Sequence, residues 1–191
     1  MEIRDYRDKV PAGNYTSGRK GWKPGLFVLH TTEGSYEGSC SWFCNPKSEV
    51  SAHYVIGLNG EVTQCVNITD TAYACGTSKN PNNNRFYGLS INSIVRNRKD
   101  NANYYTINYE IVGHYDKENG RCTITQKQID SVIQLIAKDR KTVESVYGNI
   151  IPIDSSRIIG HFEIAPIAKP YCGRGFPYSS IIRGILNYNG V

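Results

Sequence analysis

Two histidines and a cysteine are the residues whose types and positions best fit a chemical role. His30 and His161 each end a short apolar run, LFVLH and RIIGH, and Cys172 follows in the segment HFEIAPIAKPYCGRG. Zinc favours imidazole nitrogen and thiolate sulfur, and a catalytic zinc keeps three protein ligands and one open position. Each histidine alone would more often be structural. Together, and far apart in sequence, they predict a metal site assembled by the fold.

Strands must position these side chains. The apolar runs 26–30 and 157–161 predict short buried strands. Asn59-Gly60 lies between two strand-like runs and predicts a hairpin. The run 106–113 alternates, which puts Ile107, Tyr109 and Ile111 on one face and Asn108, Glu110 and Val112 on the other.

Helical patterns occupy much of the remaining chain. Thr125 and Gln128 form a capping box at the start of a long amphipathic stretch that Gly148 ends. Shorter helices are expected at 39–45 and 179–187, and 76–103 is expected to be a long loop with little regular structure. We therefore predict an α/β or α+β fold, with a single mixed β-sheet flanked by helices.

Composition narrows the class of protein. The 191 residues are 39% hydrophobic and 20% charged, as in an ordinary globular domain, and the net charge is only +5. Lysine and arginine are scattered, no apolar run could span a bilayer, and the N-terminus has no secretory h-region. We expect no nucleic-acid or membrane partner and a monomeric domain. Of the six cysteines, only Cys172 is assigned a chemical role; the others are expected to be small buried or half-buried residues.

Four segments in order then resemble a known family: VLHTTEG, VSAHYVIGLNGEV, INYEIVG and GHFEIAPIAKPYCGRGFP. They are similar to the zinc N-acetylmuramoyl-L-alanine amidases, which include phage T7 lysozyme and the peptidoglycan-recognition proteins. The resemblance covers roughly residues 22–186 and implies that family's fold for a catalytic domain at 25–187. Residues 1–24 are polar and rich in Gly, Pro and Tyr and are expected to form an arm on the surface, and 188–191 look like the possible start of a linker. It favours an endolysin from a phage of a clostridium-like host, made in the host cytoplasm and acting on the wall after release.

The resemblance also implies roles for individual residues. His30, His161 and Cys172 would hold Zn²⁺, Glu110 would be the general base, and Lys169 would stabilise the oxyanion. Zinc would be the cofactor, with no organic cofactor, and peptidoglycan the partner. Three positions depart from the family: Cys172 follows Lys169 by three positions instead of two, Ala52 replaces a tyrosine found in some branches, and Tyr73-Ala74 replaces a Trp-His pair.

The sequence also leaves other functions open. A peptidoglycan-binding protein without activity, a zinc peptidase that cuts the stem peptide, and a structural zinc domain would each fit part of the pattern. His53 is expected to be structural or to support a ligand, and His114 to be exposed. Glu33 and Glu163 are left between an ordinary surface role and support of the metal ligands. Tyr36, Tyr73 and Tyr87 are left between packing and stacking on a sugar.

Overall fold

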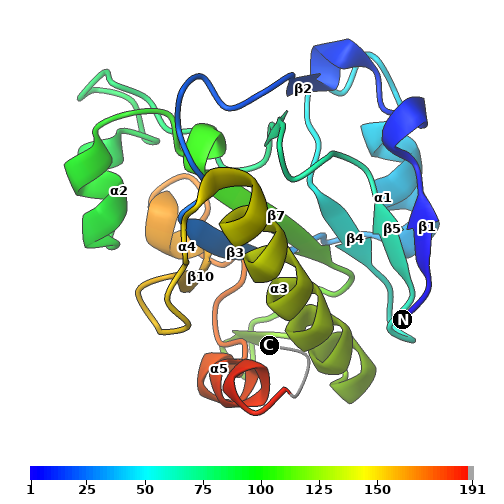
Figure 1. Ribbon diagram of the computed structural model, residues 1–191. Coiled ribbons are helices and arrows are strands. Elements are labelled where there is room, and N and C mark those ends of the chain that lie inside the picture. The colour runs from blue at the N-terminus through cyan, green and yellow to red at the C-terminus, as the bar shows by residue number, and fades with distance from the viewer. Residues whose placement is uncertain (189–191) are drawn as a thin grey trace.

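The computed structural model describes residues 1–188, and a six-stranded mixed sheet lies at its centre (Figure 1). Its strands, in spatial order, are β1 (Ile3–Asp5), β5 (Val62–Gln64), β4 (Tyr54–Ile56), β7 (Thr106–Ile111), β3 (Leu26–Thr31) and β10 (Ile158–Gly160). β4 and β5 form the antiparallel hairpin that Asn59-Gly60 predicts, and the other neighbours pair in parallel. The predicted mixed sheet is confirmed.

The alternation in β7 is also confirmed. Ile107, Tyr109 and Ile111 belong to the main hydrophobic core, whereas Asn108 and Glu110 lie on the opposite face. β3 is buried along its whole length. Because side chains alternate along a strand, Phe27 and Leu29 join the main core, and His30 lies on the same face as Glu110.

Helices cover both faces of the sheet (Figure 1). The main core is closed by α3 (Gln126–Tyr147) and α5 (Tyr178–Leu186). The opposite face carries α1 (Tyr36–Phe43), α2 (Ser93–Arg98) and α4 (His161–Ile164), which pack in two smaller clusters. Two small antiparallel ladders complete the fold: β2 (Tyr15–Thr16) with β6 (Thr71–Ala72), and β8 (Tyr115–Asp116) with β9 (Arg121–Cys122). The architecture is therefore three-layered.

The long helix has the boundaries that its end signals predict. Thr125 and Gln128 cap each other's backbone at the N-terminus of α3, and Gly148 ends the helix in the left-handed conformation, with φ +60°. Glycine adopts this conformation without steric cost. This element was fully specified by local sequence.

The segment expected to be a surface arm is more integrated than the sequence indicates. Residues 3–5 form β1, an edge strand of the central sheet that pairs with β5. Arg19 is 4% exposed and donates hydrogen bonds to the carbonyl groups of Ile68 and Thr106. Buried carbonyls need donors, so this arginine ties the segment to the domain.

Three local expectations need correction. The first helix begins at Tyr36, three residues earlier than expected, because Ser35 accepts a hydrogen bond from the backbone N–H of Gly38 and caps it. The loop 76–103 contains α2, which Asn92 caps in the same way, and a 3-10 helix at Tyr87–Leu89. A second 3-10 helix, Ala102–Tyr105, begins at its end. The strand expected at 157–161 ends at Gly160, and His161 begins α4.

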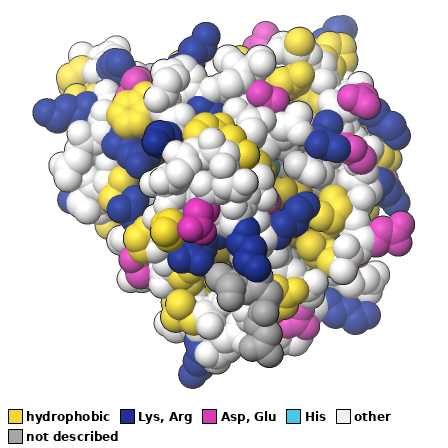
Figure 2. Space-filling model, in the orientation of Figure 1, with side chains coloured by type: hydrophobic (Ala, Val, Ile, Leu, Met, Phe, Trp, Pro, Cys, Tyr) yellow, Lys and Arg dark blue, Asp and Glu magenta, His cyan; other side chains and the backbone are white. Residues whose placement is uncertain are grey.

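The surface agrees with the dispersed charge of the sequence. On the face shown in Figure 2, lysine and arginine side chains are spread out among acidic ones. Within residues 1–188, no helix combines the length and apolar character needed to cross a membrane. The predicted linker at 188–191 lies, beyond its first residue, outside the described residues.

Candidate metal centre

Three adjacent parts of the fold bring the predicted ligands together. His30 lies near the end of β3, His161 directly follows the neighbouring strand β10, and Cys172 lies in the loop after α4. Their ligand atoms all lie within 4.8 Å of one another. The two imidazole rings meet edge to face, with centroids 4.7 Å apart. Two nitrogens and one sulfur at this spacing form a donor set suited to zinc.

The Nε2 atom of His161 supplies an independent indication of a metal. It is buried and has no hydrogen-bond partner among the described residues. Buried polar atoms are rarely left without a partner, and each exception calls for an explanation such as an ion. Burial lowers the pKa of His161 well below its usual range, with His30 and Lys169 adding to the effect. A neutral imidazole is the form that binds a metal, so this residue fits a ligand.

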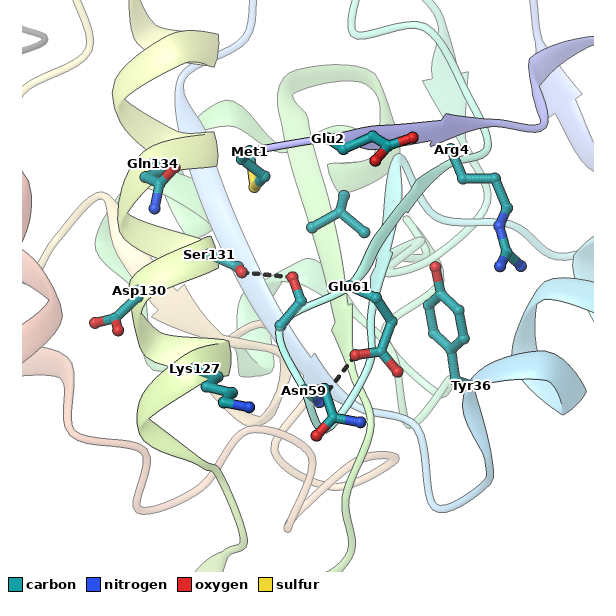
Figure 3. A pocket seen from close by; sticks show the side chains of 12 residues that line it. Met1, Glu2, Arg4, Tyr36, Asn59, Glu61, Lys127, Asp130, Ser131 and Gln134 are labelled. Carbon is teal, nitrogen blue, oxygen red and sulfur yellow. Dashed lines mark hydrogen bonds between the residues drawn. The ribbon is translucent and has the colours of Figure 1, made fainter.

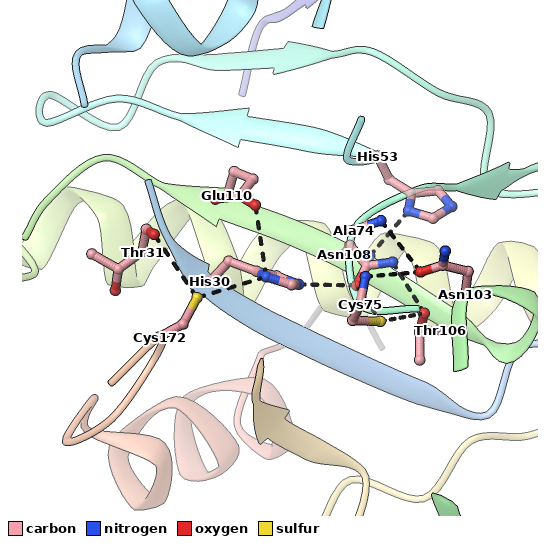
Figure 4. Close-up of polar contacts among 10 residues, drawn as sticks. All are labelled: His30, Thr31, His53, Ala74, Cys75, Asn103, Thr106, Asn108, Glu110 and Cys172. Atoms are coloured by element: carbon pink, nitrogen blue, oxygen red, sulfur yellow. Dashed lines mark hydrogen bonds and ion pairs between the residues drawn. The ribbon is translucent and has the colours of Figure 1, made fainter. Parts of the chain in front are cut away.

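His30 presents its Nδ1 atom to the same point. This nitrogen lies 3.8 Å from Sγ of Cys172 and 3.6 Å from Oε1 of Glu110 (Figure 4). Its other nitrogen, Nε2, lies 3.0 Å from Oδ1 of the buried Asn108. One edge of the ring therefore faces the site and the other is held by the protein.

The loop that carries Cys172 is fixed by backbone contacts. The N–H of Phe162 donates to the carbonyl of Cys172 at 3.0 Å, and the N–H of Lys169 donates to that of Ala165 at 2.8 Å. The longer spacing between Lys169 and Cys172 is accommodated by a turn, in which the N–H of Cys172 lies 3.4 Å from the carbonyl of Lys169. Burial raises the pKa of the Cys172 thiol, so a thiolate here requires a positive partner such as a metal ion.

Glu110 lies beside the ligands but is not fully enclosed, with 16% of its side chain exposed. Burial raises the pKa of its carboxyl, and the neighbouring His30 and Lys169 oppose this rise. Lys169 is exposed at the rim. Among the described residues, no ion pair joins Glu110 to Lys169. Glu110 and Lys169 therefore do not form a buried ion pair whose only role would be stability.

A cleft of about 260 Å³ opens over this centre. All five predicted site residues line it: His30, Glu110, His161, Lys169 and Cys172. Sequence reasoning missed Trp42, which also lines the cleft and is 50% exposed. Its exposure is not visible in the sequence, so only the structure places it in the cleft.

The tyrosines and glutamates that the sequence left open lie in different environments. Tyr73 lines the cleft, whereas the Tyr36 hydroxyl bonds Thr63 and Tyr87 packs in a satellite cluster beneath α2. Glu33 accepts from the N–H of Tyr115. The remaining acid, Glu163, accepts from the N–H of Gly160. Glu33 therefore bonds the segment at Tyr115 and Glu163 caps the N-terminus of α4, and neither of these hydrogen bonds is made to a predicted metal ligand.

The structure also shows where the two other histidines and the residues that depart from the family pattern lie. His53 is fully buried beside Arg19, and His114 is exposed, both as expected. Ala52 is buried in the cluster under α1. Ala74 lines the cleft next to Tyr73, so the position of the missing histidine does face the site.

A larger hollow, of about 640 Å³, lies at the other edge of the sheet between the N-terminus and α3 (Figure 3). Its lining includes Glu2, Arg4, Glu61, Lys127 and Asp130, with neither histidine nor cysteine among the described residues that form it. Hydrogen bonds within the lining, such as Ser131 Oγ to the carbonyl of Gly60 at 2.7 Å, hold the hairpin against the helix. The chemistry therefore belongs to the smaller cleft.

Comparison with known proteins identifies the family of the chain. Residues 20–174 match the sequence profile of a family described as N-acetylmuramoyl-L-alanine amidase. The chain is 42% identical over 163 residues to N-acetylmuramoyl-L-alanine amidase A of Achromobacter lyticus, covering 80% of this chain and 78% of that protein.

Solved structures show the same fold. A selenomethionine derivative of AmpD aligns with a TM-score of 0.62 and 21% identity, covering 97% of this chain and 94% of that one. The catalytic domain of XlyA aligns with a TM-score of 0.59 and 16% identity, covering 97% and 99%. The predicted fold class is confirmed.

Proposed function

Because the chain belongs to the N-acetylmuramoyl-L-alanine amidase family, we propose that it hydrolyses the amide between N-acetylmuramic acid and L-alanine in peptidoglycan, using zinc held by His30, His161 and Cys172. The observation that carries this proposal is the meeting of these three ligand atoms within 4.8 Å in a cleft that Glu110 and Lys169 also line. The unpartnered Nε2 of His161 supports the presence of an ion.

The ligand set leaves room for catalysis. Three protein ligands are the usual complement of a catalytic zinc, whereas structural zinc sites are closed by four. When bound, the ion supplies Lewis acidity, which lowers the pKa of a coordinated water and polarises the scissile carbonyl. The residues around it must then position the amide and move protons.

Glu110 is the proposed general base. Its carboxylate lies on the site side of β7, 3.6 Å from a ligand nitrogen, and is partly open to the cleft. It can accept the proton of the attacking water and return that proton to the nitrogen of L-alanine as the amide bond breaks. A carboxyl pKa raised by burial suits both steps, because a base works best when its pKa is near the working pH.

Lys169 is the proposed oxyanion donor. Its ammonium group is exposed at the rim of the cleft and forms no ion pair among the described residues, so it can turn toward charge that develops on the carbonyl oxygen. Stabilisation of the charge that develops on the oxyanion is often the largest catalytic contribution. Trp42 and Tyr73 offer aromatic faces in the same cleft for a sugar ring.

The test of this proposal is metal dependence of wall lysis. Exhaustive chelation should abolish the clearing of purified cell walls, and one equivalent of Zn²⁺ should restore it. Circular dichroism before and after chelation provides the control for folding. Full lysis by protein whose metal content is confirmed as nil would exclude the zinc mechanism. Wall binding without lysis by the zinc-loaded protein would indicate a non-catalytic binder instead.

A further inference from the structure

The side chain of Asn108, which has no part in the proposed mechanism, lies against His30 on the side of the ring away from the metal centre. The His30 ring lies between the metal-facing atoms and the side chain of Asn108, whose Oδ1 is 3.0 Å from Nε2 (Figure 4). We infer that Asn108 is a positioning residue, which fixes the tautomer and orientation of His30 so that Nδ1 presents its lone pair to the metal. This inference rests on the proposed zinc site.

A closed ring of hydrogen bonds holds the Asn108 amide in place. Its Nδ2 lies 3.0 Å from Oγ1 of Thr106, and its Oδ1 lies 3.2 Å from Sγ of Cys75. The ring closes between Cys75 and Thr106, where Sγ and Oγ1 are 3.2 Å apart. All three side chains are fully buried, so water does not offer an alternative partner.

The donors and acceptors of this ring are all matched when the amide nitrogen of Asn108 faces Thr106. The amide nitrogen can only donate, so Thr106 Oγ1 accepts from it and donates its own proton to the Cys75 sulfur. Burial raises the pKa of the Cys75 thiol to about 12, so the thiol keeps its proton and donates it to Oδ1. In this arrangement the oxygen of Asn108 faces His30.

The backbone of Asn108 is held as firmly as its side chain. Its N–H donates to Nδ1 of the buried His53 at 3.0 Å, and its carbonyl accepts from the N–H of His53 at 3.1 Å. His53 therefore holds the backbone of Asn108 through two hydrogen bonds. This contact explains a buried histidine that touches no metal-facing atom.

The consequence for His30 follows from the chemistry of a neutral imidazole. One ring nitrogen carries the proton and the other is an acceptor. An amide oxygen opposite Nε2 requires the proton there, which leaves the lone pair on Nδ1, the atom that faces Cys172 and Glu110. Partners of this kind typically change metal affinity 10- to 100-fold.

The experiment compares three variants. Asn108→Leu removes the acceptor, Asn108→Asp keeps an oxygen opposite Nε2, and Asn92→Ala removes another buried asparagine, which caps α2 and bonds the carbonyl of Ser156. Zn²⁺ affinity of the folded proteins is measured by competition with a chromophoric chelator. The affinity should fall by about 10- to 100-fold in Asn108→Leu, whereas Asn108→Asp and Asn92→Ala should stay within about threefold of the wild type.

Nitrogen-15 NMR of the metal-free wild-type protein supplies a second readout that does not need any variant to fold. The His30 ring should show a protonated Nε2 and an unprotonated Nδ1. The opposite tautomer, or equal Zn²⁺ affinity in Asn108→Leu and wild type, would overturn the inference while leaving the zinc site in place. A wild-type protein that binds no Zn²⁺ would instead overturn the proposed function itself.

Discussion

His30 and Glu110 are direct register partners on adjacent parallel strands, β3 and β7. Partners in register on parallel strands point to the same face of a sheet. The ligand and the proposed base are therefore set side by side by backbone pairing, and their side chains approach to 3.6 Å. Because the ligand and the proposed base are different residues, metal binding and proton transfer can be tested by separate substitutions.

Replacing the proposed base or oxyanion donor should leave the metal in place. Glu110→Gln and Lys169→Ala should each bind one Zn²⁺ and lose about 10²-fold or more in the rate of wall hydrolysis. Metal analysis and initial rates on the same samples provide the check. Near-normal rates in a folded variant would remove that residue from the mechanism.

Cys172 should act as a ligand and not as a nucleophile. Cys172→Ser should lose Zn²⁺ and activity together, whereas Cys172→Asp should keep part of both because a carboxylate oxygen also binds zinc. The matched control is Cys65→Ser, which changes a buried thiol in the cluster under α1. Stoichiometric Zn²⁺ in Cys172→Ser would place the third ligand elsewhere.

Gly173 should be needed for the loop that presents Cys172. It has φ +79°, and a Cβ there would lie 2.5 Å from the carbonyl oxygen of Leu29. Gly173→Ala should therefore destabilise the fold and weaken Zn²⁺ binding. Gly148→Ala is the control, since Gly148 has φ +60° with open space around it, and it should cost only about 1–2 kcal/mol of backbone strain. Thermal melts and chelator competition would separate the two effects.

Asp139 should make the stability of the fold depend on pH. This carboxyl is 1% exposed and accepts hydrogen bonds from the Tyr54 and Tyr109 hydroxyls. Burial raises its pKa to about 6, against the opposing effect of those two bonds. A raised carboxyl pKa stabilises the fold below the unfolded value near 4, and this contribution is lost as the pH rises through 6.

The variant Asp139→Asn removes that titration. The difference in unfolding free energy between variant and wild type should shift in favour of the variant by up to about 3 kcal/mol between pH 4 and pH 7. Urea melts across this range measure it. Asp130→Asn, an exposed change on the same helix, is the control. A difference that stays constant with pH would show that Asp139 titrates normally.

Much of the site was readable from local sequence, because its parts follow strand periodicity and strand ends. The alternation of β7 places Glu110 opposite the core residue Tyr109, and His30 ends an apolar run. The long helix was equally readable from its capping residues. These features depend on neighbours close in sequence, which is the information that periodicity and end signals contain.

The parts that were missed depend on partners distant in sequence. Nothing in Ile3–Asp5 marks an edge strand, because the pairing comes from β5. The polar position of Asn108 was readable, but its contacts with Cys75 and His30 arise only when the strands and the loop assemble. Exposure of Trp42 in the cleft likewise depends on how α1 is seated.

The position of the bond that is cut distinguishes an amidase from a peptidase. Purified peptidoglycan digested by the zinc-loaded protein should release stem peptides whose new N-terminal residue is L-alanine, identified by mass spectrometry after amine labelling, together with intact glycan strands. Glu110→Gln, treated in parallel, should release about 10²-fold less. New amino groups on residues inside the stem peptide, with alanine still joined to muramic acid, would contradict the assignment and identify a peptidase.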